Sequence, residues 1–219
     1  MVLRPSTLRE DIGQIFSQPT ERERAEAFLS AIRENWRQNN TALSRSVTSM
    51  LVLGAIFELL VRTAIDQVSI GPFEIKDLSL VRISIPPIIS YLFYESGILT
   101  SRQSVFRAVH DMTIRTVNQR VFDAGLNLVL SPEEHPLTYP NLWGFEQIRV
   151  VRWVNSVLTF ATVGGILIFE GYAYYVQFLR LDIRGPIIWV SLTITVLLLC
   201  AAVGLIIGER GSAEQRQTA

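Results

Sequence analysis

The chain alternates long apolar stretches with polar ones, and the apolar stretches set its expected architecture. Four of them are long enough to cross a bilayer: Val47–Val68, Val81–Leu99, Trp153–Leu179 and Pro186–Gly208. A membrane-spanning helix needs about 20 mostly apolar residues, because each residue rises about 1.5 Å and the hydrocarbon core is about 30 Å thick. The pattern therefore predicts an all-α fold, a four-span transmembrane helical bundle with a small helical cytoplasmic layer.

The polar segment before the first span, residues 1–45, holds two Thr-x-x-Glu capping boxes. Each box is followed by apolar residues at helical spacing, which predicts cytoplasmic amphipathic helices. The stripe behind the second box comprises Ala25, Phe28, Leu29, Ile32 and Trp36. Nearby glutamates weaken attraction to anionic lipid, so we expect this stripe to pack against the chain's own cytoplasmic segment rather than on the membrane surface.

The other segments follow from the spans. We expect a first transmembrane hairpin with a short outer loop in 46–100, a cytoplasmic helix and Pro-rich loop in 101–150, a second transmembrane hairpin in 151–208, and a disordered cytoplasmic tail in 209–219. In the outer loop, the triplets Val68–Ile70 and Phe73–Ile75 alternate around Gly71 and Pro72. That pattern predicts a small hairpin-like turn.

Charge distribution sets the predicted topology. The chain has zero net charge and is 49% hydrophobic, and its mean hydropathy of +0.30 is too high for an ordinary soluble domain of 219 residues. Arginines crowd the segments before the first span and between the second and third. The opposite side offers only Lys76, Arg82, Arg180 and Arg184. Because cytoplasmic loops carry the excess of Lys and Arg, both termini and the central segment are predicted to be cytoplasmic.

The choice of basic residues indicates in which membrane the protein lies. Lys76 is the only lysine among 20 basic residues, a bias that favours a GC-rich bacterial genome and hence the bacterial inner membrane, the plasma membrane of the cell. The polar N-terminus shows no signal peptide, so the first span would serve as the insertion signal. Cys200 is the only cysteine, and no intrachain disulfide is therefore expected.

Five ionisable residues in or beside the spans form a predicted intramembrane charge network: Glu58, Arg62, Asp66, Glu95 and Glu170. A charge at the bilayer centre costs about 2.5–3.5 kcal/mol on insertion scales, so these groups should pair or line a wet cavity. The first three share one helix face at i, i+4 and i+8. Arg62 and Glu170 lie about 22 and 25 Å above the inner boundary. We therefore expect these two to pair, within one subunit or between subunits.

Glu95 lies about 7 Å above the inner boundary, where Arg45 or Arg102 is expected to pair with it. Two interpretations of the charge network stay open. The carboxylates either line an ion or proton path or form neutralised pairs that fix helix register. A candidate partner exists for each carboxylate, which favours the structural interpretation.

Small residues predict where spans contact one another. Gly204 and Gly208 form a GxxxG pattern, and Ala161 and Gly165 repeat that spacing beside Gly164. Such positions let helices approach closely, either within a subunit or between subunits. Proline removes backbone donors and kinks a helix, which a membrane tolerates where neighbouring helices or water bond the freed carbonyls. The adjacent prolines 86 and 87 lie in the outer third of the second span, a position that also fits a role limited to shaping the helix entry.

Recognisable catalytic and cofactor chemistry is present only in fragments. The two histidines, His110 and His135, lack metal-ligand spacing, and no nucleotide-binding or nucleophile motif occurs. No histidine lies within a span to hold a haem. The arginines of the central helix do not form a nucleic-acid-binding stripe. The sequence thus predicts no catalytic residues, no metal, no cofactor and no nucleic-acid partner, and it favours a protein that is not an enzyme.

The cytoplasmic segments supply about as many residues as the spans, which favours a protein that assembles in the lipid bilayer with itself or with another membrane protein. Our first hypothesis is a homo-oligomeric pore, channel-like or membrane-perturbing, assembled through its cytoplasmic helices. Its path would be lined by Glu58, Arg62, Asn155, Thr159 and Glu170. The alternative is a non-catalytic accessory or scaffold subunit of a larger membrane complex. A transporter ranks third and a membrane enzyme last.

Overall fold

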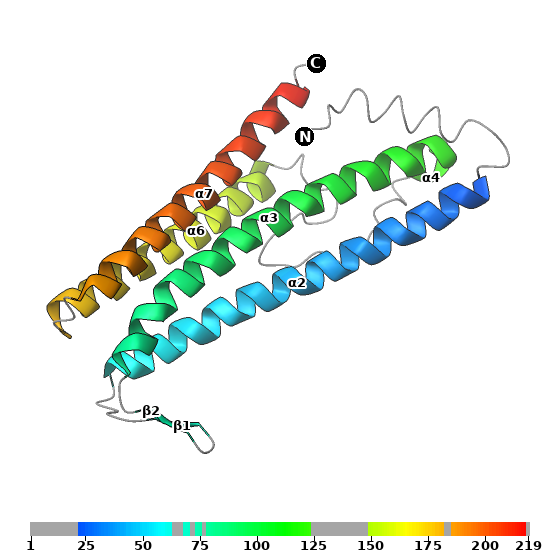
Figure 1. Ribbon diagram of the computed structural model, residues 1–219. Helices are drawn as coiled ribbons and strands as arrows, with labels where there is room; N and C mark the ends of the chain where they lie inside the picture. The colour runs from blue at the N-terminus through cyan, green and yellow to red at the C-terminus, as the bar shows by residue number, and fades with distance from the viewer. Residues whose placement is uncertain are drawn as a thin grey trace. The chain divides into compact units, whose positions relative to one another are not determined.

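The structure, a computed structural model, describes residues 22–62, 68–70, 73–75, 78–123, 149–181 and 185–217. Almost all of these lie in four long helices: α2 (Arg22–Arg62), α3 (Ser79–Val117), α6 (Arg149–Leu179) and α7 (Pro186–Gln217) (Figure 1). The short α4 (Gln119–Asp123) follows α3. The predicted helical fold is confirmed. The first capping box, Asp66, His135 and the Pro-rich loop lie outside the described residues.

Two helices run further than the sequence pattern suggested. The 41-residue α2 joins the predicted second cytoplasmic helix to the first span, and the 39-residue α3 joins the second span to the central cytoplasmic helix. No glycine or proline separates the segments at either join, and extending a helix is far easier than starting one. The central helix is interrupted at Asn118, between α3 and α4.

The predicted outer turn is a two-stranded antiparallel hairpin, β1 (Val68–Ile70) and β2 (Phe73–Ile75), in which Val68 pairs with Ile75 and Ile70 with Phe73. This confirms the predicted hairpin but corrects the first span, which we expected to reach Val68. At the other end of the chain, α7 continues to Gln217, through most of the tail expected to be disordered. The tail's Ala, Glu, Gln and Arg residues favour helix strongly enough to extend it.

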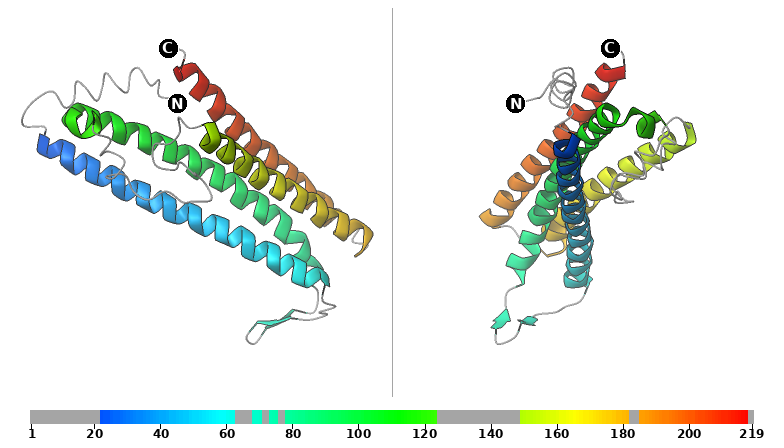
Figure 2. Two further views of the ribbon diagram at one scale, coloured as in Figure 1. Left: turned by 180° about the vertical axis from the view of Figure 1, so that it is seen from behind. Right: turned by 90° about the vertical axis from the view of Figure 1, so that its right-hand side faces the viewer.

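The chain divides into two compact units. Unit 1 comprises the described residues of 1–43 and 99–155, and unit 2 those of 44–98 and 156–219. The helices α2, α3 and α6 each contribute a part to both. In unit 2, α2 and α3 run antiparallel, with bonds joining Ser46 to Glu95 and Arg82 to Leu60 (Figure 2).

Unit 1 is organised around Trp36 of α2, which is 1% exposed. Its ring lies edge-on to the ring of His110 on α3, with centroids 5.8 Å apart. Arg33 donates from Nε to His110 Nε2 at 3.4 Å, and Asn39 donates to the Leu99 carbonyl at 2.8 Å. The α2 stripe therefore packs against the chain's own α3, although Phe28 at its edge is exposed.

Unit 2 has a compact apolar core made from α2, α3 and α6. Its buried residues are Phe57, Leu60, Leu78, Ile85, Ile89 and Ala173. Phe169 packs against this cluster, and its ring meets that of Phe57 edge-on at 5.6 Å. Edge-to-face aromatic pairs contribute about 0.5–1.5 kcal/mol beyond the area they bury. This core fixes the three helices around the polar groups described below.

Within the described ranges, two helices are long and apolar enough to cross a membrane: Ala25–Arg62 and Pro186–Leu205. The first contains most of the predicted first span, and the second most of the predicted fourth. By length and composition, each of the two predicted transmembrane hairpins thus contains one candidate membrane span among the described residues.

The burial pattern of unit 1 yields a stability prediction within α3. Ile114 is 3% exposed and Val105 is 51% exposed, and both are β-branched. Ile114→Ala should lower the free energy of unfolding by about 2–5 kcal/mol, because it leaves a cavity. Val105→Ala should change it by less than about 0.5 kcal/mol. Thermal unfolding of the purified variants measures both, and equal effects would contradict the assigned core.

Candidate functional site: a buried polar network

Two adjacent prolines in α3 create the site. Pro86 and Pro87 lie inside the helix, and neither has an N–H to donate four residues back. The carbonyls of Arg82 and Ile83 therefore lose their helical partners. A buried carbonyl without a partner costs about 1–3 kcal/mol, so both need donors from elsewhere.

Each freed carbonyl receives a hydrogen bond from a different helix. Gln177 of α6 donates from Nε2 to the Arg82 carbonyl at 2.9 Å, and Ser191 of α7 donates from Oγ to the Ile83 carbonyl at 2.8 Å. Gln177 is fully buried and Ser191 is 5% exposed. Neighbouring helices thus bond both of the carbonyls that the prolines free. Through these two hydrogen bonds, the carbonyls that the prolines free link α3 to α6 and to α7.

A hydroxyl chain extends from Ser191. Tyr174 Oη lies 2.9 Å from Ser191 Oγ and 2.8 Å from Thr195 Oγ1. Because the one proton of Ser191 goes to the Ile83 carbonyl, Tyr174 must donate to Ser191, and Thr195 must then donate to Tyr174. The direction of every bond is therefore fixed, from Thr195 to the carbonyl. Such a fully ordered chain specifies one packing of α6 on α7.

Arg82 binds α2 as well. Its guanidinium donates from Nε at 3.2 Å and from Nη2 at 2.8 Å to the carbonyl of Leu60. Leu60 lies in the last turn of α2, where carbonyls have no helical partner. Arg82 thus caps α2 with its side chain while its own carbonyl accepts from Gln177. One residue of α3 connects α2 and α6.

Glu170 of α6 lies deep within unit 2, with 3% of its surface exposed. Ser90 of α3 donates from Oγ to Glu170 Oε1 at 2.9 Å. The other carboxyl oxygen, Oε2, is buried and has no hydrogen-bond partner in the described part of the chain. The expected Arg62–Glu170 pair within one chain is therefore wrong.

Arg62 pairs instead with Glu58, one helical turn before it on α2. Tyr172 of α6 also donates to Glu58, from Oη to Oε2 at 3.1 Å. These three residues, the Glu58 cluster, lie at the surface of unit 2, where the Arg62 side chain is 76% exposed. Arg62 finds its ion-pair partner on its own helix, at i, i+4 spacing. The similar depth of Arg62 and Glu170 in their spans was therefore not enough to predict that they pair.

Glu95 also has a partner different from those we expected. Ser46 of α2 donates to Glu95 Oε2 at 3.0 Å, and no ion pair joins Glu95 to Arg45 or Arg102 within the described ranges. Of the four network residues that the structure describes, only Glu58 and Arg62 are joined directly. Each of the carboxylates Glu58, Glu95 and Glu170 accepts a hydroxyl hydrogen bond from another helix.

Gly164, Gly165 and Gly204 do not lie at helix contacts within the part of the chain that the structure describes. A Cβ added at Gly164, Gly165 or Gly204 would meet nothing within 4 Å, and Ala161 is exposed. Nothing is described around Gly208. The close approaches occur at Gly54 and Gly97, where a Cβ would lie 3.8 Å from Phe169 and from Leu205. A contact between subunits at the predicted glycines stays a prediction.

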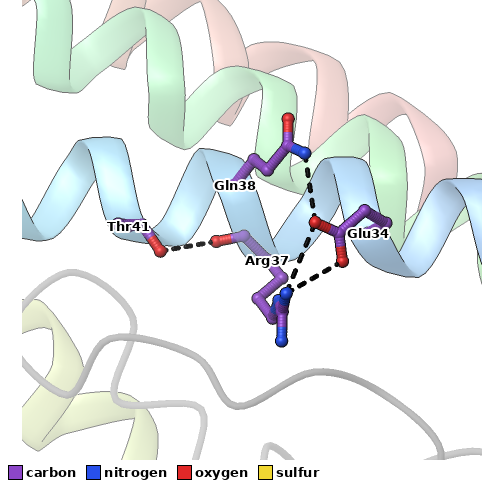
Figure 3. Close-up of polar contacts among 4 residues, drawn as sticks. All are labelled: Glu34, Arg37, Gln38 and Thr41. Atoms are coloured by element: carbon purple, nitrogen blue, oxygen red, sulfur yellow. Dashed lines mark hydrogen bonds and ion pairs between the residues drawn. The ribbon is translucent and has the colours of Figure 1, made fainter.

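Unit 1 also carries polar groups that face outward, besides buried ones such as Asn39 and His110. On α2, Glu34 accepts from Arg37 and from Gln38, and Thr41 donates back to the Arg37 carbonyl (Figure 3). All these bonds are local and exposed, which is typical of a solvated helix face. Among the described residues, no group of three metal-binding side chains gathers anywhere.

No known protein family, curated protein or solved structure matches this chain. The interpretation of the site therefore rests on its geometry.

Sequence reasoning identified the prolines and carboxylates but missed their partners. Glu170, Tyr174 and Gln177 recur at i, i+4 and i+7 on α6, and Ser191 and Thr195 at i and i+4 on α7. Each set forms a polar stripe on a mostly apolar helix, which is the signal that could have found them. The carbonyls that need these donors could also be identified from the sequence, because each proline frees the carbonyl four residues before it.

The proline pairing predicts a selective rescue. Gln177→Leu should cost about 1–3 kcal/mol of stability, because the Arg82 carbonyl loses its donor. Pro86→Ala restores an N–H for that carbonyl and should reduce the cost. Pro87→Ala serves as the matched control, since it supplies the Ile83 carbonyl instead. The reverse selectivity is expected for Ser191→Ala.

Thermal unfolding of the single and double variants gives the coupling energies. Equal rescue of Gln177→Leu by both proline substitutions would contradict the assignment of one donor to each carbonyl.

Proposed function

We propose that the chain is a four-span integral membrane protein in which α2, α3, α6 and α7 each supply one span. The distribution of apolar side chains in unit 2 carries this proposal. Large apolar groups lie on its surface, Ile168 at 74% exposure and Leu197 at 65%, while Glu170, Gln177 and Thr195 are buried. Water disfavours that arrangement, whereas lipid favours it, because polar groups in hydrocarbon must be satisfied inside the protein.

The contrast with unit 1 supports the same proposal. Among the described residues, the large apolar side chains exposed in unit 1 are only Phe28, Val105 and Trp153. The arginine-rich segments also belong to unit 1. The positive-inside rule then orients unit 1 and both termini toward the cytoplasm of a bacterial cell, with the β1–β2 hairpin outside.

The exposed Glu58 cluster supports assembly with further copies. Glu58 lies about 16 Å above the predicted inner boundary, near the middle of the hydrocarbon core. Charged side chains at that depth face protein or water rather than lipid. The surface around the Glu58–Arg62 pair is therefore covered in the membrane. A second copy is the simplest cover, which gives a homo-oligomer with this pair at or near a subunit boundary.

In such an oligomer, the Glu58 clusters of successive subunits would form a charged ring, and rings of charged side chains select ions in channels. A channel-like activity is thus our leading functional proposal. Glu170 would not line that path as first expected, since it is enclosed within its own subunit.

The interior of unit 2 favours a second candidate, a non-catalytic scaffold subunit of a larger membrane complex. Its buried hydroxyl and amide groups mostly bond backbone carbonyls and one another, which fixes helix positions. A different membrane protein would then cover the Glu58 cluster.

Two measurements on the native protein separate these proposals. Alkaline carbonate washing should leave the chain in the membrane pellet; its release would contradict membrane insertion. The native mass of the gently extracted complex should equal a whole number of copies of this 24.7 kDa chain. A mass that requires a second protein would favour the scaffold.

A charge swap tests the channel-like proposal directly. Glu58→Arg combined with Arg62→Glu keeps an i, i+4 ion pair on α2 but reverses the order of the charges along the span. In reconstituted liposomes, we expect the swap to change ion selectivity or conductance while the oligomer mass stays constant. Leu59→Ala, a neighbouring change without charge, is the control. Sealed liposomes with the wild-type oligomer would contradict the channel-like function.

A further inference from the structure

One buried ionisable group has no counter-charge. Glu170 accepts one hydrogen bond, from Ser90 to Oε1, and its Oε2 is enclosed without a partner among the described residues. The hydroxyl of Ser90 is itself fully buried, so water does not reach this bond from that side. An ionised carboxylate here would keep a full charge against a single neutral donor.

The charged groups on the surrounding helices bond elsewhere. On α2, Arg62 pairs with Glu58. On α3, Arg82 donates its guanidinium to the Leu60 carbonyl, and Glu95 accepts from Ser46. On α6, Tyr172 bonds Glu58, and the hydroxyl of Tyr174 is committed to Ser191 and Thr195. Between residues 186 and 205, α7 carries no Asp, Glu, Lys, Arg or His.

These surroundings decide which form of the carboxyl fits. Burying an isolated carboxylate costs far more than burying a neutral hydroxyl whose hydrogen bond is unmade. A proton on Oε2 removes the charge and leaves Oε1 as the carbonyl oxygen that Ser90 already bonds. Oε2 is enclosed and has no partner among the described residues, which is the position expected of an oxygen that carries a proton. A proton also needs no additional space there.

We infer that Glu170 is a proton-binding site within the membrane, with the proton carried on Oε2 and Ser90 positioning the carboxyl through Oε1. The inference rests on the proposed insertion of unit 2 in the bilayer. It goes beyond the channel-like proposal, in which Glu58 and Arg62 line the path, because the group concerned is a different one. Proton release would leave an uncompensated charge between α3 and α6, so occupancy of this site is linked to their packing.

Infrared spectroscopy of the full-length protein in liposomes tests the site, because a protonated carboxyl has a carbonyl stretch well separated from the bands of a carboxylate. At neutral pH, the wild-type protein should show this band, shifted in heavy water, and Glu170→Gln should lack it. Glu58→Gln is the matched control and should keep it. Ser90→Ala should move the band to higher frequency, because the carbonyl oxygen loses its hydrogen bond.

Superimposable wild-type and Glu170→Gln spectra in this region would overturn the proposal. If Glu170→Gln fails to fold, the Ser90→Ala shift decides in its place, and an unmoved band overturns the assignment. Carbonate washing distinguishes a failure of membrane insertion from a failure of the proton site. A chain that washes off the membrane yet keeps the band refutes membrane insertion alone, whereas a chain that stays in the membrane without the band refutes the proton site alone.

Discussion

Unit 2 depends on one constraint, that a backbone carbonyl removed from water must find a donor. Pro86 and Pro87 break this rule twice within one helix, at Arg82 and Ile83. Gln177 and Ser191 restore it from α6 and α7. Because the donors come from separate helices, the two prolines determine which surfaces of α6 and α7 face α3. The hydroxyl chain through Tyr174 and the capping of α2 by Arg82 extend this arrangement to all four long helices.

The same constraint explains the distribution of polarity. Helices that satisfy their polar groups internally can expose apolar side chains on the outside, and unit 2 does so along α2, α6 and α7. The described part of unit 1 exposes few large apolar side chains: Trp36 and Leu43 are buried, and the bonded Glu34 and Arg37 lie outside. The boundary between the two patterns falls within continuous helices, near residues 43 and 99. Such a distribution is the one that our proposal of a membrane protein with a water-exposed part requires.

Much of the fold could be predicted from the sequence, because apolar periodicity and turn chemistry act locally. The helical character of each apolar stretch and the pairing of Val68–Ile70 with Phe73–Ile75 required no knowledge of distant residues. The partners of the ionisable groups required the packing of the helices. Equal depth suggested that Arg62 meets Glu170, but depth does not specify the rotation of a helix about its axis. Arg62 pairs with Glu58 because the two lie one turn apart on the same helix, whereas Glu170 bonds Ser90 because α6 packs against α3.

The central claim is that lipid contacts the apolar surface of unit 2 and water contacts unit 1. Nitroxide labels on single cysteines, introduced at Ile168, Leu197 and Val105 in a Cys200→Ser background, test it most directly, since all three sites are exposed apolar positions. The account predicts that oxygen, which dissolves in lipid, relaxes the labels at 168 and 197 strongly, while a water-soluble nickel chelate reaches only the label at 105. Equal access of the nickel chelate to all three labels would contradict it.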